Sequence, residues 1–375
     1  MPKRAQNIRT VKIALGNRSY PIQIGSGARR RFGDLFKKHG SGRAFWITDR
    51  NVARLWGKDL KALWKSSPAP PIILPPGEDQ KRLCVVEDLC RKLTAAGAER
   101  GDTLIALGGG VIGDLVGFTA ACYLRGIAFV QIPTTLLAMV DSSVGGKTGV
   151  DLPEGKNLVG AFHQPRFVLA DVDFLGTLPH RELVSGLAEV VKTAIIGDRE
   201  LFIQLKHYIK ELPNLEIRVS PGMIAACAAF KAGVVREDER ESGRRRLLNF
   251  GHTVGHALER MGEYRALRHG EALFWGMYIA IELSERLKLL PPKTAGEIQE
   301  LLDYFLIQIP GITFQQKTVY KVIQRDKKVR GGRTHFVLLE DIAKPIISDR
   351  VTTEQLISTL KILRQKMRLG GRRRR

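Results

Sequence analysis

The chain has 375 residues, of which 44% are hydrophobic and 26% are charged, values typical of a soluble globular protein with two domains or one large domain. No apolar run approaches the roughly 18 residues that span a bilayer, and the basic segment Met1–Lys12 is not followed by the apolar stretch of a secretory signal. The four cysteines form no Cys-x-x-Cys pair, which argues against a disulfide framework or a thiolate zinc site and favours a cytoplasmic protein.

The net charge of +22 at pH 7 is a standard indication of nucleic-acid binding. However, the basic residues are spread along the chain and are not interleaved with aromatic side chains. We expect residues 366–375, which end in Arg372–Arg375, to be a basic, disordered tail with at most non-specific contacts to anions. An anionic small-molecule substrate is therefore a better expectation than a nucleic acid or a membrane.

The first half of the chain alternates short apolar strands with helices. Buried parallel strands have nearly continuous apolar runs, and this alternation predicts an open α/β sheet. The expected strands are Val11–Leu15, Ala44–Thr48, Thr103–Leu107, Phe129–Ile132 and Phe167–Ala170, and a typical intervening helix is Gln80–Ala96.

From Pro179 onward the hydrophobic period changes to that of helices, interrupted by one strand-like run, His335–Leu339. The expected helices are Arg181–Ile196, Pro221–Val235, Thr253–Met261, Glu271–Leu287, Lys293–Phe305 and Thr353–Leu363. We therefore predict an α/β domain over residues 1–178 and a mainly α-helical domain over residues 179–365, with a boundary near Thr177–Pro179.

A glycine-rich turn follows the strand expected at Thr103–Leu107. Gly108, Gly110 and Gly113 satisfy the G-x-G-x-x-G pattern, in which glycines allow the backbone to approach a pyrophosphate at a helix N-terminus. A tight strand-to-helix turn also satisfies this pattern, and the acidic residue usual about 20 positions later is missing. If a dinucleotide binds here, candidates to hold its ribose are Asp49, Glu78 and Lys81. Ordinary turn and surface roles are the simpler interpretation of those three side chains.

The segment Gly145–Thr148 is similar to the end of a Walker phosphate loop. The full pattern requires glycine at position 141, where this chain has Asp141, so we exclude an NTPase. What remains is a glycine-rich turn that presents Lys147 near Asp141, a candidate contact for a phosphate or a hydroxyl group.

Three histidines gather within a short part of the second half. His252 and His256 are four residues apart and share one face if the segment is helical, and His269 follows. Glu189 lies on a strongly apolar expected helix, where an unpaired carboxylate costs free energy. One glutamate and two histidines are a common ligand set for catalytic zinc, although the His-Glu-x-x-His pattern is absent. The residues predict a metal site without separating His256 from the other candidate ligands, and ordinary surface or core roles are the alternative.

Several cationic and amide side chains lie next to glycine turns or to these candidate ligands. Arginine and lysine suit carboxylate and phosphate groups. Each would be a solvated surface charge on its own, but together they predict a substrate with at least two anionic groups. They are Arg125, Lys147, Lys156, Asn157, Lys192, Lys231, Arg245 and Asn249.

Seven sequence blocks in fixed order resemble the signature blocks of the 3-dehydroquinate synthase family, within the sugar phosphate cyclase superfamily. They are Gly108–Asp114, Pro133–Leu137, Asp141–Lys147, Gly155–Asn157, Ala188–Lys192, Asn249–Ala257 and His269–Glu271. The similarity runs from near Val11 to Leu339. It implies a Rossmann-like NAD-binding domain followed by a helical metal- and substrate-binding domain, with the active site in the cleft between them. It also implies a homodimer in which Arg125 reaches a neighbouring site.

The resemblance also implies a role for each matching residue. The ligands of a zinc or cobalt ion would be Glu189, His252 and His269. Catalysis would involve His256 in proton transfer, Glu241 in support of it, and Lys192. The substrate contacts would be Arg125, Asp141, Lys147, Asn157, Lys192, Lys231, Arg245, Asn249 and Lys327 (or Lys328). The NAD contacts would be Asp49, Glu78, Lys81, Gly109, Gly110, Asp114, Thr134, Thr135, Lys156 and Thr177.

The implied reaction converts 3-deoxy-D-arabino-heptulosonate 7-phosphate to 3-dehydroquinate and phosphate, a step of the shikimate pathway to aromatic amino acids. It would proceed by transient oxidation with NAD, phosphate elimination, re-reduction and intramolecular aldol closure. The alternatives are another sugar phosphate cyclase and a metal-dependent alcohol dehydrogenase. The first is disfavoured because Arg245, Asn249 and His256, together with Lys327, fit the pattern of a substrate that carries a carboxylate.

Overall fold

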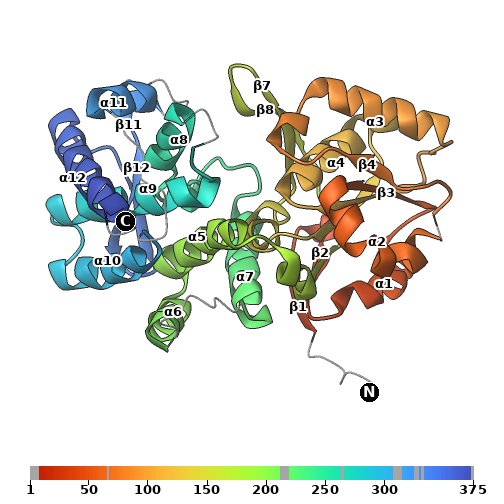
Figure 1. Ribbon diagram of the computed structural model, residues 1–375, viewed down its shortest axis with the longest axis horizontal. Helices are drawn as coiled ribbons and strands as arrows, with labels where there is room; N and C mark the ends of the chain where they lie inside the picture. The colour runs from red at the N-terminus through yellow and green to blue at the C-terminus, as the bar shows by residue number, and fades with distance from the viewer. Residues whose placement is uncertain are drawn as a thin grey trace. The chain divides into compact units, whose positions relative to one another are not determined.

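The computed structural model describes residues 8–65, 67–211, 219–262, 266–306, 315–324, 329–330 and 333–372 (Figure 1). The chain forms two compact units. The first consists of Met1–Leu183 and Val219–Arg240, and the second consists of Val184–Arg218 and Glu241–Arg375. In the described part of the chain, no helix combines the length and the hydropathy needed to cross a membrane.

A seven-stranded sheet with the order β1-β2-β9-β6-β5-β3-β4 forms the centre of the first unit. The edge strand β1 pairs antiparallel with β2, and all the other pairings are parallel. Every residue of β5 is buried, as expected for a central parallel strand. The strands are β1 (Arg9–Ile13), β2 (Tyr20–Gly25), β3 (Ala44–Asp49), β4 (Ile72–Leu74), β5 (Thr103–Gly108), β6 (Ala128–Pro133) and β9 (Val168–Asp171).

Helices and one hairpin complete this unit. The apolar α4 packs against β5 and β6 and is covered by the hairpin, so its buried side chains join one core with those of β3 and β5. The helices are α1 (Phe32–His39), α2 (Arg50–Trp64), α3 (Leu83–Ala95), α4 (Gly110–Cys122) and α7 (Pro221–Glu237), and the hairpin strands are β7 (Lys147–Leu152) and β8 (Gly155–Phe162).

The strand order reverses at the centre of the sheet. From β3 the chain moves outward to β4, whereas from β5 it moves in the opposite direction to β6. Ligands of open α/β sheets bind beyond the carboxyl ends of the two strands at such a reversal. The glycine turn that follows β5 and Asp49 at the end of β3 both lie at this point.

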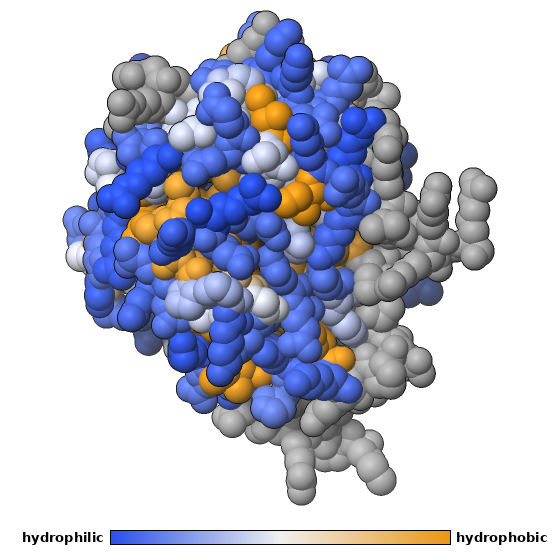
Figure 2. All heavy atoms as spheres, turned by 90° about the vertical axis from the view of Figure 1, so that its left-hand side faces the viewer, coloured by the Kyte–Doolittle hydropathy of each residue, from blue (hydrophilic) through white to orange (hydrophobic). Residues whose placement is uncertain are grey.

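The second unit is mainly helical. Its long central helix α9 (His269–Arg286) is buried along most of its length and packs against α8, α10, α12 and β12. The other elements are α5 (His180–Gly197, from Val184 onward), α6 (Arg199–Glu211), α8 (His252–Met261), α10 (Pro292–Leu306), α11 (Gln316–Gln324), α12 (Thr353–Arg372), the short strands β10 (Val329–Arg330) and β11 (Arg333–Thr334), and the hairpin β12 (Phe336–Asp341) with β13 (Lys344–Ser348). Figure 2 shows one face of the molecule, where hydrophilic side chains surround scattered apolar patches.

Glycines allow the helices of this unit to approach one another closely. A Cβ atom on Gly276 of α9 would lie 1.9 Å from the carbonyl oxygen of Gly251, just before α8. A Cβ atom on Gly270 would lie 2.0 Å from the carbonyl oxygen of Ser185 in α5. Both distances are far below van der Waals contact, so α9 touches α5 and the start of α8 backbone to backbone.

The predicted α/β sheet and helical half are confirmed, with element ends displaced by a few residues. Periodicity did not predict β2, β4, the hairpin β7–β8, α6, α11 or the short strands β10, β11 and β13, and it gave no range for α1 or α2. The compact units differ from the predicted domains in two respects: the first unit extends to Leu183 rather than to residue 178, and it also includes Val219–Arg240, because α7 packs against β1 and β2. The apolar pattern of a helix does not indicate which sheet it will pack against.

The predicted tail, residues 366–375, overlaps the end of helix α12. Helix α12 continues to Arg372, so most of the segment 366–375 is helical. The ammonium group of Lys366 lies 2.6 Å from Asp303 Oδ1 and 4.1 Å from the centre of the Tyr278 ring. These contacts fix the beginning of the segment against α9 and α10, which the run of basic residues did not indicate.

Candidate active site

The glycine turn after β5 has the geometry of a phosphate-binding turn. A Cβ atom on Gly108 would lie 2.7 Å from Ile112, and one on Gly113 would lie 2.8 Å from the side-chain oxygen of Gln131. A side chain at Gly108 would therefore clash with the base of the Ile112 side chain, whereas one at Gly113 would require Gln131 to move. The first amides of α4 lack partners within the helix, which is the property that attracts anions to helix N-termini. Thr134 belongs to the same turn, because its backbone amide donates to the carbonyl of Gly108 at 3.0 Å.

Beside this turn, the buried Lys81 is the centre of a polar cluster. Its side chain is only 5% exposed, and its ammonium group lies 2.9 Å from Asp114 Oδ2 and 2.6 Å from Asn157 Oδ1. Glu78 Oε1 lies 3.9 Å from the Lys81 Nζ and 3.5 Å from the Nζ of Lys156. The structure thus brings together four predicted NAD contacts and one predicted substrate contact. Burial opposes the charged form of Lys81, but the carboxylates of Asp114 and Glu78 outweigh it and raise the pKa of the ammonium group.

Sequence reasoning missed Asp151, which holds this cluster in shape. Its Oδ1 accepts a hydrogen bond from the backbone amide of Asn157 at 2.7 Å, and its own amide donates to the carbonyl of Lys81 at 2.7 Å. Asn157 has a φ of 53°, a left-handed conformation that this hydrogen bond supports. The only available signal was the hairpin turn between β7 and β8, which was not predicted.

Asp141 and Lys231 form a second pair in the first unit. The Lys231 ammonium group donates to Asp141 Oδ1 at 2.6 Å and to the Asp141 carbonyl oxygen at 2.8 Å. Asp141 lies in a π-helix, Ala138–Ser142, a local irregularity that often marks functional sites. Lys147, at the start of β7, is exposed, and Arg125 is exposed in a turn with a φ of 67°.

The other predicted NAD contacts of this unit have ordinary local roles. Asp49 caps α2 by accepting hydrogen bonds from the backbone amides of Asn51 and Val52 at 2.8 and 3.0 Å. The hydroxyl group of Thr177 accepts a hydrogen bond from the Trp56 indole at 2.9 Å. The side-chain oxygen of Thr135 accepts from the amide of Ala138 at 3.2 Å. Such contacts fit the turn and surface interpretation and do not prevent a second role at the sheet end.

In the second unit, three helices bring Glu189, His252 and His269 together. One nitrogen or oxygen atom from each lies within 4.8 Å of the corresponding atoms of the other two. Glu189 Oε1 is 3.3 Å from His269 Nε2 and 3.7 Å from His252 Nε2. The Glu189 side chain is only 2% exposed, and its Oε2 forms an ion pair with Lys192. A buried carboxylate flanked by two imidazoles is a suitable donor set for a divalent ion, so the residues fit a metal of the zinc type.

The tautomer of His252 follows from its other nitrogen. His252 Nδ1 lies 3.1 Å from the carbonyl oxygen of Phe250, which can only accept a hydrogen bond. Nδ1 therefore carries a proton, and Nε2 faces Glu189. This arrangement prepares the imidazole as a metal ligand.

His256 lies one helical turn after His252 in α8. Its ring centre is 5.2 Å from that of His252 and 6.2 Å from that of His269, and the side chain is exposed. His256 also forms a second possible ligand group with Glu259 and His269. Glu259, a buried residue of α8 that sequence reasoning did not single out, lies 3.5 Å from His269 Nδ1 through its Oε2.

Burial disfavours the charged form of His269, but hydrogen bonds to Glu189 and Glu259 outweigh it and raise the pKa of the imidazole to about 10. Without an ion, His269 is therefore protonated at neutral pH and bridges the two carboxylates. A metal ion that binds at Nε2 must take the place of that proton.

The remaining predicted residues of this unit lie in the segment before α8. The amide nitrogen of Asn249 donates to Glu241 Oε1 at 2.8 Å. Arg245 is only 1% exposed and lies in a 3-10 helix, Arg244–Asn249, that packs against β12 and β13. Lys327 and Lys328 lie outside the described residues.

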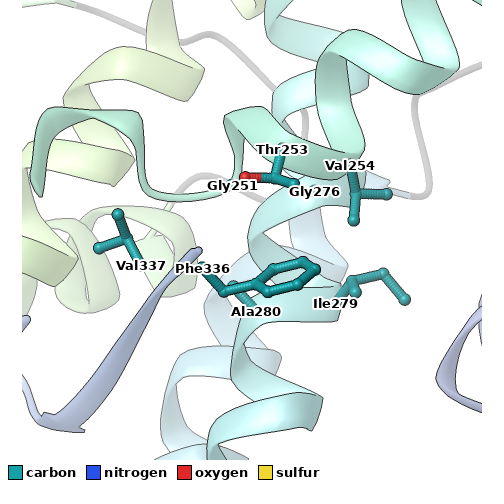
Figure 3. Close-up of a pocket in the computed structure, with 8 residues that line it drawn as sticks. All are labelled: Gly251, Thr253, Val254, Gly276, Ile279, Ala280, Phe336 and Val337. Atoms are coloured by element: carbon teal, nitrogen blue, oxygen red, sulfur yellow. The ribbon is translucent and has the colours of Figure 1, made fainter. Parts of the chain in front are cut away.

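A small apolar pocket lies between α8, α9 and β12 (Figure 3), lined in part by Val254, Ile279 and Phe336. Its interior holds about 10 Å³, which is roughly the space of one water molecule. It is a packing gap in the core and is too small for a sugar phosphate.

This chain combines a parallel sheet, a glycine turn and a carboxylate–imidazole cluster. Its fold is that of the sugar phosphate cyclases and their structural relatives. One solved 2-deoxy-scyllo-inosose synthase, complexed with carbaglucose-6-phosphate, NAD+ and Co2+, is 27% identical with a TM-score of 0.83, covering 95% of this chain and 99% of its own. A 2-epi-5-epi-valiolone synthase from Streptomyces hygroscopicus subsp. jinggangensis, with NAD+ and Zn2+ bound, is also 27% identical with a TM-score of 0.83, covering 94% of this chain and 99% of its own.

Sequence similarity narrows this class to one family. Residues 71–185 match the family model described as 3-dehydroquinate synthase N-terminal. Residues 186–329 match the family model described as 3-dehydroquinate synthase C-terminal. The 3-dehydroquinate synthase of Rhodospirillum rubrum is 46% identical over 93% of both chains. That of Caulobacter vibrioides is 43% identical over 92% of this chain and 96% of its own. The chain belongs to the 3-dehydroquinate synthase family.

The alcohol dehydrogenase alternative receives support at the level of fold alone. An iron-containing alcohol dehydrogenase from Thermotoga maritima has a TM-score of 0.65 at 16% identity, covering 92% of this chain and 97% of its own. The much higher identity to the 3-dehydroquinate synthases decides between the two alternatives.

Proposed function

We propose that this chain converts 3-deoxy-D-arabino-heptulosonate 7-phosphate to 3-dehydroquinate and phosphate, using NAD and one divalent ion, zinc or cobalt. The observation that carries this proposal is the convergence of Glu189, His252 and His269 in a chain of this family. When bound, NAD supplies a reversible hydride acceptor, and the divalent ion supplies a Lewis acid for substrate oxygens.

Glu189, His252 and His269 would hold the ion. Glu189 brings the negative charge that a divalent cation needs, and its burial keeps water from screening that charge. Lys192 keeps the second oxygen of Glu189 occupied, which leaves Oε1 directed at the imidazoles. Lys192 would also contact the substrate, because its cationic group lies next to the proposed ligand.

The NAD contacts are assigned to the end of the sheet. The backbone of the glycine turn would receive the pyrophosphate. The Lys81 cluster would position polar groups beside it, because Lys81 holds Asp114 and Asn157 at hydrogen-bonding distance. The full proposed set is Asp49, Glu78, Lys81, Gly109, Gly110, Asp114, Thr134, Thr135, Lys156 and Thr177.

The substrate carries a carboxylate and a phosphate, and cationic side chains would bind both. Lys231 is held by Asp141, which limits the conformations of its ammonium group and orients it before the substrate arrives. The full proposed set is Arg125, Asp141, Lys147, Asn157, Lys192, Lys231, Arg245, Asn249 and Lys327.

Proton transfer is assigned to His256, supported by Glu241. The exposed imidazole of His256 can exchange protons with a substrate hydroxyl group, while His252 and His269 are committed to Glu189 through Nε2. Glu241 accepts from the Asn249 amide and would keep that side chain oriented toward the substrate.

We also propose a homodimer and a cytoplasmic location. Arg125 would contact the site of a second subunit, since its exposed side chain follows a turn with positive φ at both Leu124 and Arg125. Leu124 and Arg125 are both exposed, so the Arg125 side chain is accessible to another subunit.

The test is to incubate the protein with the heptulosonate phosphate, NAD and zinc or cobalt, and to follow phosphate and 3-dehydroquinate together. We expect equal amounts of both products and no accumulation of NADH. Net NADH formation without phosphate release would identify an alcohol dehydrogenase. Turnover of sedoheptulose 7-phosphate or glucose 6-phosphate, with no turnover of the heptulosonate phosphate, would identify another sugar phosphate cyclase.

A further inference from the structure

Two carboxylates contact the imidazole of His269 through different nitrogens. Nε2 lies 3.3 Å from Glu189 Oε1, whereas Nδ1 lies 3.5 Å from Glu259 Oε2. Glu189 comes from α5 and Glu259 from α8, so the ring is held between carboxylates of two different helices. The two edges of one imidazole therefore have separate partners.

The two ring nitrogens of His252 also have separate partners, but the partner of Nδ1 is of a different kind. Its Nε2 faces Glu189, and its Nδ1 faces the carbonyl oxygen of Phe250 at 3.1 Å. In both rings Nε2 is directed at the shared carboxylate while an acceptor holds Nδ1. The acceptor is a backbone carbonyl for His252 and a charged side chain for His269, and only the latter can be removed by mutation.

The position of Glu259 in α8 explains how it reaches His269. It lies seven residues after His252 and three after His256, spacings that place all three on one face of the helix. Its side chain is 4% exposed, and a carboxylate buried to this degree needs charged or hydrogen-bonding partners to offset desolvation.

We propose that Glu259 is a positioning residue that orients the His269 ring and keeps the proton on Nδ1, so that Nε2 is available to the ion. This inference rests on the metal site of the proposed function and adds a residue to it. Partners of this kind fix the tautomer of a histidine ligand, and their loss typically weakens metal affinity by about 10–100-fold.

A different role for Glu259 follows from the same cluster. Glu259, His256 and His269 could themselves surround an ion. However, that ion would use the opposite edge of His269 and would leave the buried Glu189 outside its ligand set. The distances of Glu189 to both His252 and His269 favour the Nε2 side, with Glu259 as the partner of Nδ1.

The test measures zinc affinity by competition with a chelator, and the visible spectrum of the cobalt-loaded protein, in the full chain without substrate. Glu259→Gln keeps an acceptor for Nδ1 and should weaken zinc binding by about tenfold, whereas Glu259→Met removes the acceptor and should weaken it by about 100-fold. The cobalt spectrum should change in both variants, because the orientation of one ligand changes.

Glu282→Gln and Glu282→Met are matched controls. Glu282 is a half-buried carboxylate in α9, the helix that carries His269, and it accepts a hydrogen bond from Gln299 at 2.7 Å. These controls should keep wild-type zinc affinity and the wild-type cobalt spectrum. Thermal unfolding of all variants in EDTA separates a loss of folding from a loss of metal binding.

Three outcomes would overturn the proposal. Wild-type zinc affinity in Glu259→Met would show that Nδ1 needs no partner. Loss of binding as complete as in His252→Ala would show that Glu259 is a ligand. An unchanged cobalt spectrum in a destabilised Glu259→Met would show a structural role only. Because none of these measurements uses the substrate, a protein that binds zinc as expected but does not release phosphate would contradict the proposed reaction and leave the role of Glu259 intact.

Discussion

Each unit holds a cluster around one buried charged side chain, and the central charges have opposite signs. In the first unit a buried ammonium group, Lys81, is surrounded by Asp114, Glu78 and the amide oxygen of Asn157. In the second unit a buried carboxylate, Glu189, is surrounded by His252, His269 and Lys192. The first cluster surrounds its ammonium group with carboxylate and amide oxygens of the protein itself. The second includes imidazoles, so its charge depends on a proton or on a metal ion.

The two clusters also differ in whether they are complete before a ligand binds. The Lys81 cluster is complete without a ligand, and its value lies in stability and in a fixed shape beside the glycine turn. Under the proposed function, a cation would take the place of a proton in the Glu189 cluster. Mutations should therefore affect stability in the first cluster and metal binding in the second.

The largest effect is expected for His252→Ala. This variant should lose metal and phosphate release together, with kcat/KM falling by at least about 100-fold, because a Lewis acid supplies several kcal/mol to the transition state. Metal content after dialysis and phosphate release are the measurements. Full activity in a metal-free variant would contradict the ligand assignment.

Lys81→Met should destabilise the first unit. It leaves Asp114 without its ammonium partner in a buried site, and breaking such a pair costs about 3–5 kcal/mol. The measurement is the free energy of unfolding in urea. Lys156→Met is the matched control, because its contact with Glu78 is 3.5 Å long and partly exposed, and its loss should cost less than about 1 kcal/mol. Equal losses in both variants would remove the contrast between the clusters.

Metal binding should release a proton near neutral pH. The pKa of His269 is raised to about 10 in the metal-free protein, so an incoming ion must displace that proton. Apparent zinc affinity should therefore rise about tenfold per pH unit between roughly pH 7 and 9. Calorimetry in buffers of different ionisation enthalpy counts the protons released.

The proton on His269 weakens metal binding, but it should stabilise the metal-free protein. A pKa raised from 6.5 to about 10 stabilises the fold fully below pH 6.5, and this contribution is lost as pH rises through 10. Unfolding in EDTA should therefore become easier between these limits. A metal affinity that is constant over this range would mean that His269 is neutral without metal.

The smallest effect is expected from removal of residues 366–375. Turnover should be unchanged, because none of the proposed site residues lies there. Stability should fall by less than about 1 kcal/mol from loss of the partly exposed Lys366–Asp303 pair. Lys366→Met should reproduce the part of this fall that belongs to the ion pair. A large fall in kcat after the deletion would place the end of α12 in the site.

Sequence reasoning recovered what is local or chemically unusual. The glycine turn after β5 was predicted because its glycines satisfy the G-x-G-x-x-G pattern directly after an apolar strand, and Glu189 was predicted because a carboxylate on an apolar helix needs a partner. Asp151 was missed because its role depends on a hairpin that brings it to Lys81 and Asn157. Glu259 was missed because it reads as an ordinary helical residue until α9 places His269 beside it. The return of α7 to the sheet was also unpredictable, since hydrophobic period shows that a face is buried but not what covers it.

Close backbone contacts at Gly276 and Gly270 limit how far apart the helices of the proposed metal site lie. Two of the helices that carry the proposed ligands converge on α9 at these glycines, so the gap between the ligands is governed by main-chain contact. A single methyl group at either position would push the helices apart and widen the space for an ion without altering any coordinating atom. Substitutions at these two glycines would thus change the preference of the proposed site for one cation over another, although neither glycine would contact the ion.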